Sequence, residues 1–174
     1  MYQKPVLDKD KFADYSELVK QLLSTEDAKA ILALECDKID KPPKITKTEI
    51  IFNGKGDDGH ETFLFRRDDK PSEPLMHPSP ENLKGLSCFN FCKTAQKPYD
   101  KYVVACCILA KVIFDKDVRF SSDGDIENLQ EGKELAEKVL QSKVTIKPYD
   151  NGFEIEHEYR KATSEAEFIK DISK

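Results

Sequence analysis

Residues 87–121 decide the fold class, and they read SCFNFCKTAQKPYDKYVVACCILAKVIFDKDVRFS. The stretch from Ser87 to Cys92 has the length and composition of a short strand. Pro98 stands at the position that proline favours at the start of a helix, and the apolar run after it predicts a buried helix to about Phe114. Residues 118–121 then mark a second strand. A strand, a helix and a strand in this order predict a right-handed βαβ crossover over about 87–121, with the two strands parallel.

Two hairpins are predicted outside this crossover. β-rich runs flank the glycine-rich stretch from Gly54 to Gly59, which predicts a hairpin with a longer loop over about 48–66. Alternating runs flank Asn151-Gly152, a dipeptide typical of tight turns, which predicts a second hairpin over about 143–160.

Helical spacing of apolar residues predicts further helices over 10–23 and 129–140. Ser164 followed by Glu167 resembles a capping box and predicts a short terminal helix. Residues 27–36 fit either a helix or a buried strand, and periodicity does not separate the two.

These elements predict a single α+β domain over residues 1–174, with a mixed sheet, one βαβ crossover, two hairpins and helices packed on the sheet. Residues 66–85 interrupt the pattern with polar side chains and four prolines. A structureless segment of this length is uncommon in a compact domain, so we expect a long surface loop with a functional or mobile role.

Charge and composition narrow the classes of function. The chain has 174 residues, and 28 Lys+Arg against 33 Asp+Glu give a net charge of −5, the opposite of what a charge-driven nucleic-acid binder needs. The longest uncharged apolar run, Tyr102 to Ala110, is too short to cross a membrane. Five cysteines without a disulfide-scaffold spacing indicate a reduced chain, and we expect a cytoplasmic protein.

The first candidate site lies at the carboxyl ends of the two crossover strands, where open sheets commonly bind ligands. The helix starts at this edge would present free N–H groups to an anion such as phosphate. The candidate ligand-binding residues are Lys93, Thr94, Lys97, Ser121 and Ser122, and Asp123 and Asp125 are candidates to hold Mg²⁺ beside a phosphate. The same residue types also serve as ordinary helix caps and turn formers, so a purely structural role stays open.

The second candidate site is the loop of the first hairpin. His60 stands near Asp57, Asp58 and Glu61, which would suit a general base oriented by a carboxylate or part of a metal site. A solvated acidic loop with a surface histidine is the alternative.

A third candidate joins the two sites. In this hypothesis His60 activates the Cys92 thiol, and Asp123 orients the imidazole ring. A cysteine nucleophile needs such a base or a helix N-terminus to lower its pKa, and Cys92 comes shortly before a predicted helix. Strand alternation places the Cys92 side chain on the other face of the strand from Phe89 and Phe91.

Five short strings between residues 50 and 130 resemble a family of uncharacterised bacterial cytosolic proteins. The strings are Phe52-Asn53-Gly54, Gly59-His60-Glu61-Thr62-Phe63, Phe91-Cys92-Lys93-Thr94-Ala95, Lys97-Pro98-Tyr99-Asp100 and Ser121-Ser122-Asp123-Gly124-Asp125. The resemblance implies a bacterial cytosolic protein. No activity is known for the family, so it implies no catalytic residue.

Two classes of function therefore remain. The first is a binding module for a small anionic, phosphate-bearing ligand or for a protein partner, to which an acidic surface would be suited if the partner is basic. The alternative is a hydrolase or phosphate-processing enzyme that uses a metal or the pair of Cys92 and His60.

Overall fold

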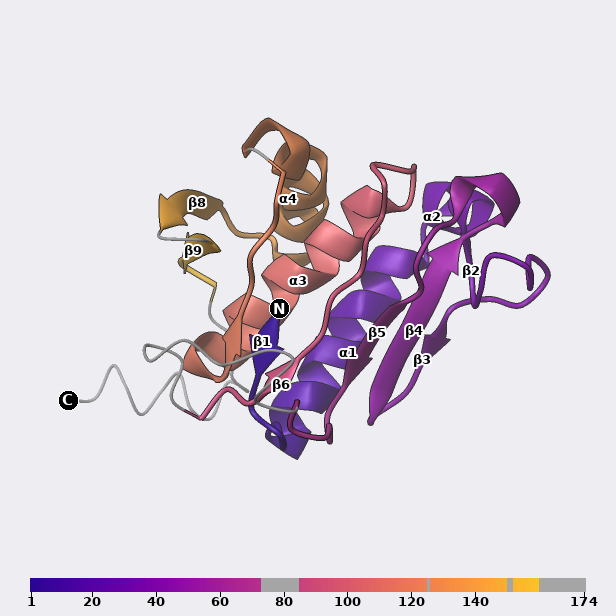
Figure 1. Cartoon of the computed structure of the whole chain (residues 1–174). Coiled ribbons are helices and arrows are strands. Elements are labelled where there is room, and N and C mark those ends of the chain that lie inside the picture. The colour runs from indigo at the N-terminus through magenta and orange to yellow at the C-terminus, as the bar shows by residue number, and fades with distance from the viewer. Residues whose placement is uncertain (73–84, 125, 150–151, 160–174) are drawn as a thin grey trace, which may run out of the picture.

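The computed structural model describes residues 1–72, 85–124, 126–149 and 152–159. The α+β class is confirmed (Figure 1). The helices are α1 (Lys9–Leu23), α2 (Glu26–Ile31), α3 (Asp100–Phe114) and α4 (Ile126–Leu140). The strands are β1 (Tyr2–Gln3), β2 (Leu32–Ala33), β3 (Lys44–Ile45), β4 (Glu49–Gly54), β5 (Phe63–Arg66), β6 (Cys88–Phe89), β7 (Val118–Arg119), β8 (Val144–Tyr149) and β9 (Gly152–His157).

The predicted crossover is the unit formed by β6, α3 and β7. Strand β1 lies between β6 and β7 and pairs antiparallel with both. The two crossover strands therefore run in the same direction, as predicted, but they do not pair with each other. The sequence pattern predicts one mixed sheet. Within the described residues there are instead three sheets: β6-β1-β7, β2-β4-β3 with β5 added to β4, and the hairpin β8-β9.

Both hairpins are present. Strands β4 and β5 pair antiparallel with Ile50 opposite Phe65, and β8 and β9 pair with Ile146 opposite Ile155. Residues 27–36 contain both of the alternatives, because α2 ends at Ile31 and β2 follows directly. The predicted helix at Ser164 lies outside the described residues, as does the 73–84 part of the predicted loop.

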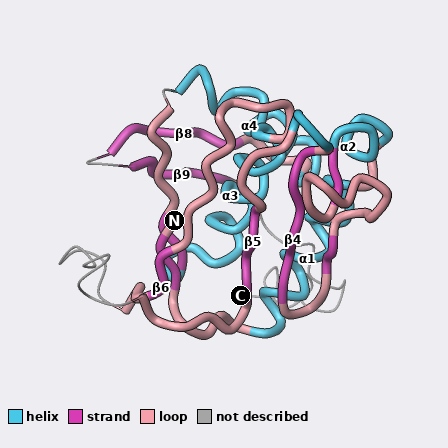
Figure 2. Tube along the Cα trace, turned by 45° about the vertical axis from the view of Figure 1, so that its right-hand side comes forward, coloured by secondary structure: helices cyan, strands magenta, loops and turns pink. Residues whose placement is uncertain are grey.

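The core lies between the helices and the sheets. Helix α1 packs on α3, and its rings of Phe12 and Tyr15 contact Phe65 of β5. Figures 1 and 2 both show β5 beside β4. An aromatic cluster joins these elements, with ring centroids of Tyr15 and Phe65 5.1 Å apart and those of Tyr15 and Phe114 5.7 Å apart.

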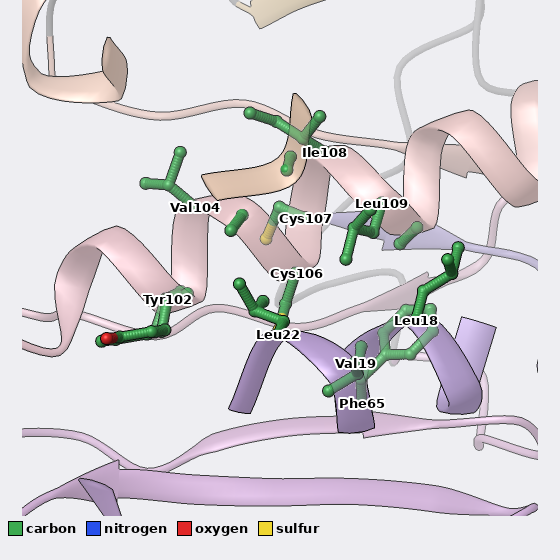
Figure 3. Close-up of a cluster of buried hydrophobic side chains, with 14 of the residues drawn as sticks. Leu18, Val19, Leu22, Phe65, Tyr102, Val104, Cys106, Cys107, Ile108 and Leu109 are labelled. Atoms are coloured by element: carbon green, nitrogen blue, oxygen red, sulfur yellow. The ribbon is translucent and has the colours of Figure 1, made fainter. Parts of the chain in front are cut away.

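Helix α3 is buried along most of its length, as its apolar run predicts. Cys106 and Cys107 are core residues, and Figure 3 shows Cys106 close to Leu22 of α1. Helix α4 packs on α3 with Gly132 at the crossing, where an added Cβ atom would lie 2.5 Å from Val104. Within the described part of the chain, no helix is both long and apolar enough to cross a membrane.

Candidate functional site

A groove with a volume of about 1210 Å³ lies next to Met1. A strand that extended β1 in the N-terminal direction, past Met1, would run along this groove. Residues 89–96 form one wall and residues 120–124 the other. Figure 1 shows these segments running from β6 and β7 toward the starts of α3 and α4. The floor is apolar and comes from α3 and α4, through residues that include Val103, Val104 and Leu129.

This groove brings together most of the predicted site residues. His60, Cys92, Lys93, Thr94, Ser121, Ser122 and Asp123 all line it. Lys97 does not, because its Nζ donates a hydrogen bond of 2.8 Å to the carbonyl oxygen of Asp57. Asp125 lies outside the described residues.

The hydroxyl groups at the predicted anion site have local partners. Thr94 donates to the Asp100 carboxylate, and Ser122 Oγ accepts from the Gly124 N–H at 3.1 Å. Burial raises the pKa of Asp100, and the nearby charge of Asp123 adds to this shift. The carboxylates of Asp100 and Asp123 line the groove beside the ammonium group of Lys93. The groove therefore has charges of both signs and does not select an anion.

A set of hydrogen bonds fixes the wall at Lys93 to the hairpin loop. Nδ1 of His60 lies 2.8 Å from the carbonyl oxygen of Lys93, and Glu61 N–H donates to the same oxygen at 3.2 Å. In return, the N–H of Lys93 donates to Oε2 of Glu61 at 2.7 Å. The hairpin loop and the wall are therefore one connected unit, and His60 and Glu61 hold it together.

The buried side chain of Asn53 also fixes the hairpin loop. It is not among the candidate site residues predicted from the sequence. Its side chain is 1% exposed. The amide nitrogen Nδ2 donates to the carbonyl of His60 and to Thr62 Oγ1, and Oδ1 accepts from the N–H groups of Gly54 and His60. The Asn-Gly pair was the available signal, since asparagine commonly bonds the backbone of a turn.

The three residues of the hypothetical triad share the groove, but His60 and Cys92 each bond to other partners within the described part of the chain. Cys92 Sγ donates to the carbonyl oxygen of Glu61 at 3.3 Å, and Tyr99 OH donates to the same oxygen at 2.7 Å. Burial raises the pKa of the Cys92 thiol to about 12, and the charges of Glu61 and Asp100 add to the shift. A thiol in this environment stays protonated at neutral pH, which does not favour a nucleophilic role.

We expect Cys92 to alkylate slowly in the native protein. A pKa of about 12 instead of 9.0 leaves roughly a thousandfold less thiolate at pH 8 than in the unfolded chain. Iodoacetamide labelling of the Cys92 peptide, followed by mass spectrometry with and without urea, measures this. The rate should rise about tenfold per pH unit up to about pH 11. A plateau near pH 8 would contradict this expectation and support Cys92 as a nucleophile.

For the metal hypothesis, the described residues contain no group of three or more His, Cys, Asp or Glu side chains arranged to hold a metal ion. The Asp123 and Asp125 pair remains a prediction, since only Asp123 is described.

The backbone of the two walls carries the most informative geometry. Met1 and Asn90 exchange two hydrogen bonds, of 2.8 and 2.9 Å. Hydrogen-bonded residues alternate along an antiparallel pair, so Cys92, two residues further on, directs its N–H and C=O toward the line of β1. The bonds of Lys93 to Glu61, on the opposite side, agree with this alternation.

The opposite wall has the matching arrangement. Arg119 pairs with Tyr2 of β1, while the carbonyl of Phe120 points away and accepts from Phe153 N–H at 3.5 Å. By alternation, Ser121 directs its N–H and C=O into the groove. Within the described residues, the backbone of neither Cys92 nor Ser121 has a hydrogen-bond partner on that side.

Comparison of the chain with protein-family models, with curated proteins and with solved structures found no match. The function is therefore inferred from the geometry of the groove.

Proposed function

We propose that this chain is a binding module that accepts an extended segment of a partner protein as an added strand in the groove. The observation that carries the proposal is the pair of backbone edges at Cys92 and Ser121, which face each other across the extension of β1. Strand addition of this kind obtains affinity from main-chain hydrogen bonds and specificity from pockets for alternate side chains.

The register defines the direction of the added strand. Because β6 and β7 both run opposite to β1, a segment that is antiparallel to both walls runs in the same direction as β1. Its last two residues would pair with Ser121 and Cys92, in the same alternation that Tyr2 and Met1 follow.

The two faces of the groove favour different side chains. One side chain would lie on the apolar floor of Val103, Val104 and Leu129. The next would lie on the outer face beside Phe91, which is 61% exposed and stands 6.0 Å, ring to ring, from Phe89. An alternating segment with β-branched residues toward the floor suits this arrangement.

We expect an N-terminal extension to test the groove directly. Adding Val-Thr-Val-Thr ahead of Met1 places both valines toward the floor. Side chains alternate between the two faces of a strand, and each valine is an even number of residues from Met1, so both lie on the same face as Met1. Hydrogen exchange at the amides of Cys92 and Ser121 should then slow at least tenfold, measured by NMR. The control extension Asp-Thr-Asp-Thr has the same backbone but directs carboxylates onto the apolar floor, which is costly. Equal exchange in the two variants would show that the groove does not accept a strand.

A free peptide tests binding between molecules. The probe is a blocked hexapeptide of alternating valine and threonine, added to the chain without any extension. It should slow exchange at the same two amides, and the Val-Thr-Val-Thr variant should not respond, because its own extension occupies the groove. A response of similar size in that variant would place the peptide elsewhere and contradict the proposal.

The compartment is part of the proposal. All five cysteines are free, which supports a reducing environment, and we place the protein in the bacterial cytoplasm.

A further inference from the structure

A second pocket lies between the ends of α1 and α2 and the loop at residues 39–43. Its volume is about 310 Å³, and it shares no lining residue with the groove. We propose that this lysine pocket binds a small amphipathic anion, with an aromatic or branched aliphatic body and one carboxylate, sulfate or phosphate group. The lining residues are Lys20, Leu23, Ala28, Lys29, Leu32, Ile39, Asp40, Lys41, Pro42, Pro43, Ile45 and Lys55.

The charge of the pocket is opposite to that of the chain. Four lysines and one aspartate line it, whereas the whole chain carries a net charge of −5. Lys20 and Lys29 each have a carboxylate partner on their own helix, and Lys55 donates to the carbonyl of Lys29 at 2.6 Å. Among the described residues, the Lys41 side chain has no hydrogen-bond or ion-pair partner, so its ammonium group is available to a ligand.

The floor of the pocket is apolar. Ala28 and Leu32 are almost fully buried beneath it, and Ile39 is 51% exposed at its rim. Small-ligand sites combine mostly apolar walls with a few polar groups that set the orientation, and a volume near 300 Å³ is at the small end of their range. Apolar walls for the body and lysines for the head group therefore select an amphipathic anion over inorganic phosphate or a neutral hydrocarbon.

The position of the pocket is determined by local structure. The N–H of Leu34 donates to the carbonyl of Lys41 at 2.8 Å, which folds the 39–43 loop back toward β2. Two consecutive prolines then stiffen the return to β3. The loop is thus held open as a wall rather than collapsed onto Leu32.

The test uses 2-naphthalenesulfonate as the probe. Two control compounds each have one half of its structure: 2-naphthalenemethanol has the aromatic body without a charge, and inorganic phosphate has the negative charge without an apolar body. Titration of the full chain, followed by amide chemical shifts, should give saturable shifts at the pocket residues with the sulfonate and at least tenfold weaker binding of each half. Lys41→Gln should weaken sulfonate binding about fivefold, the effect of one nearby charge in water. Lys138→Gln, an exposed lysine on α4, is the matched control and should leave it unchanged.

Removing Ile39 tests the apolar half. Ile39→Ser leaves the core intact because the side chain is half exposed, and it should weaken sulfonate binding without shifting the urea midpoint of unfolding. Equal binding by the Lys41 and Lys138 variants, shifts outside the pocket, or no binding at millimolar probe would each overturn the proposal. None of these outcomes bears on the groove, whose test is amide exchange at Cys92 and Ser121.

Discussion

Gly54→Ala is expected to lower the free energy of unfolding by about 3 kcal/mol, at the upper end of the range for overpacked sites. A Cβ atom at Gly54 would lie 2.2 Å from the carbonyl oxygen of Asp58 and 2.7 Å from its carbonyl carbon. Both are backbone atoms, so no side-chain rotation relieves the contact. The loop would have to move, and with it the Asn53 hydrogen bonds that hold His60. Urea unfolding measures the loss.

Gly56→Ala is the matched control for this prediction. Gly56 lies in the same loop with φ +51°, and an added Cβ there would meet nothing within 4 Å. Its cost is the left-handed backbone alone, about 1 kcal/mol. Equal losses in the two variants would mean that close packing of Gly54 against Asp58 does not hold the loop.

Gly132→Ala is the second prediction with a large expected effect, and its sign is opposite to helix propensity. Alanine stabilises an exposed helix interior by about 1 kcal/mol relative to glycine. At Gly132, however, the added Cβ would lie 2.5 Å from Val104 Cβ and 2.9 Å from the Lys101 carbonyl oxygen. We therefore expect a net loss of about 2 kcal/mol in thermal or urea unfolding, because α4 must move away from α3.

A double-mutant cycle isolates the cause of this loss. Val104→Ala removes the Cγ1 methyl group that would lie 2.5 Å from the added Cβ, while Val104 Cβ stays, so combining it with Gly132→Ala should cost somewhat less than the sum of the single variants. Glu131→Ala, an exposed neighbour on α4, should change stability by no more than about 0.5 kcal/mol. Strict additivity of the two core variants would contradict the proposed contact.

Elements with strong periodicity were predictable from the sequence. The α1 and α4 helices, the buried α3 and both hairpins follow from apolar spacing and from turn residues such as Gly152. Strand β1 was not predictable, because two residues carry no alternation. Its position between β6 and β7 depends on partners more than 80 residues away in sequence, and without β1 the expected sheet was mixed.

The candidate site was predicted in part. Seven of the predicted residues line one groove, since the ends of the crossover strands do meet at one edge. Their roles were harder to predict. Thr94 and Ser122 bond to neighbours, and the environment of Cys92 depends on Glu61 and Tyr99, which only the folded chain brings to it. The groove itself is lined by segments far apart in the sequence, from His60 to Leu129, which only the tertiary fold brings together.

The position of β1 also constrains the order in which the elements fold. The partners of β1 follow much later in the chain, with Tyr2 pairing to Phe89 of β6 and to Arg119 of β7. Helix α2 and the β4-β5 hairpin contact mainly elements near them in the sequence and are free to form before then, whereas α1 packs mostly on α3 and α4. The three-stranded sheet has to wait for Arg119 and closes loops of more than 80 residues, so the walls of the groove are expected to be among the last parts to acquire native structure.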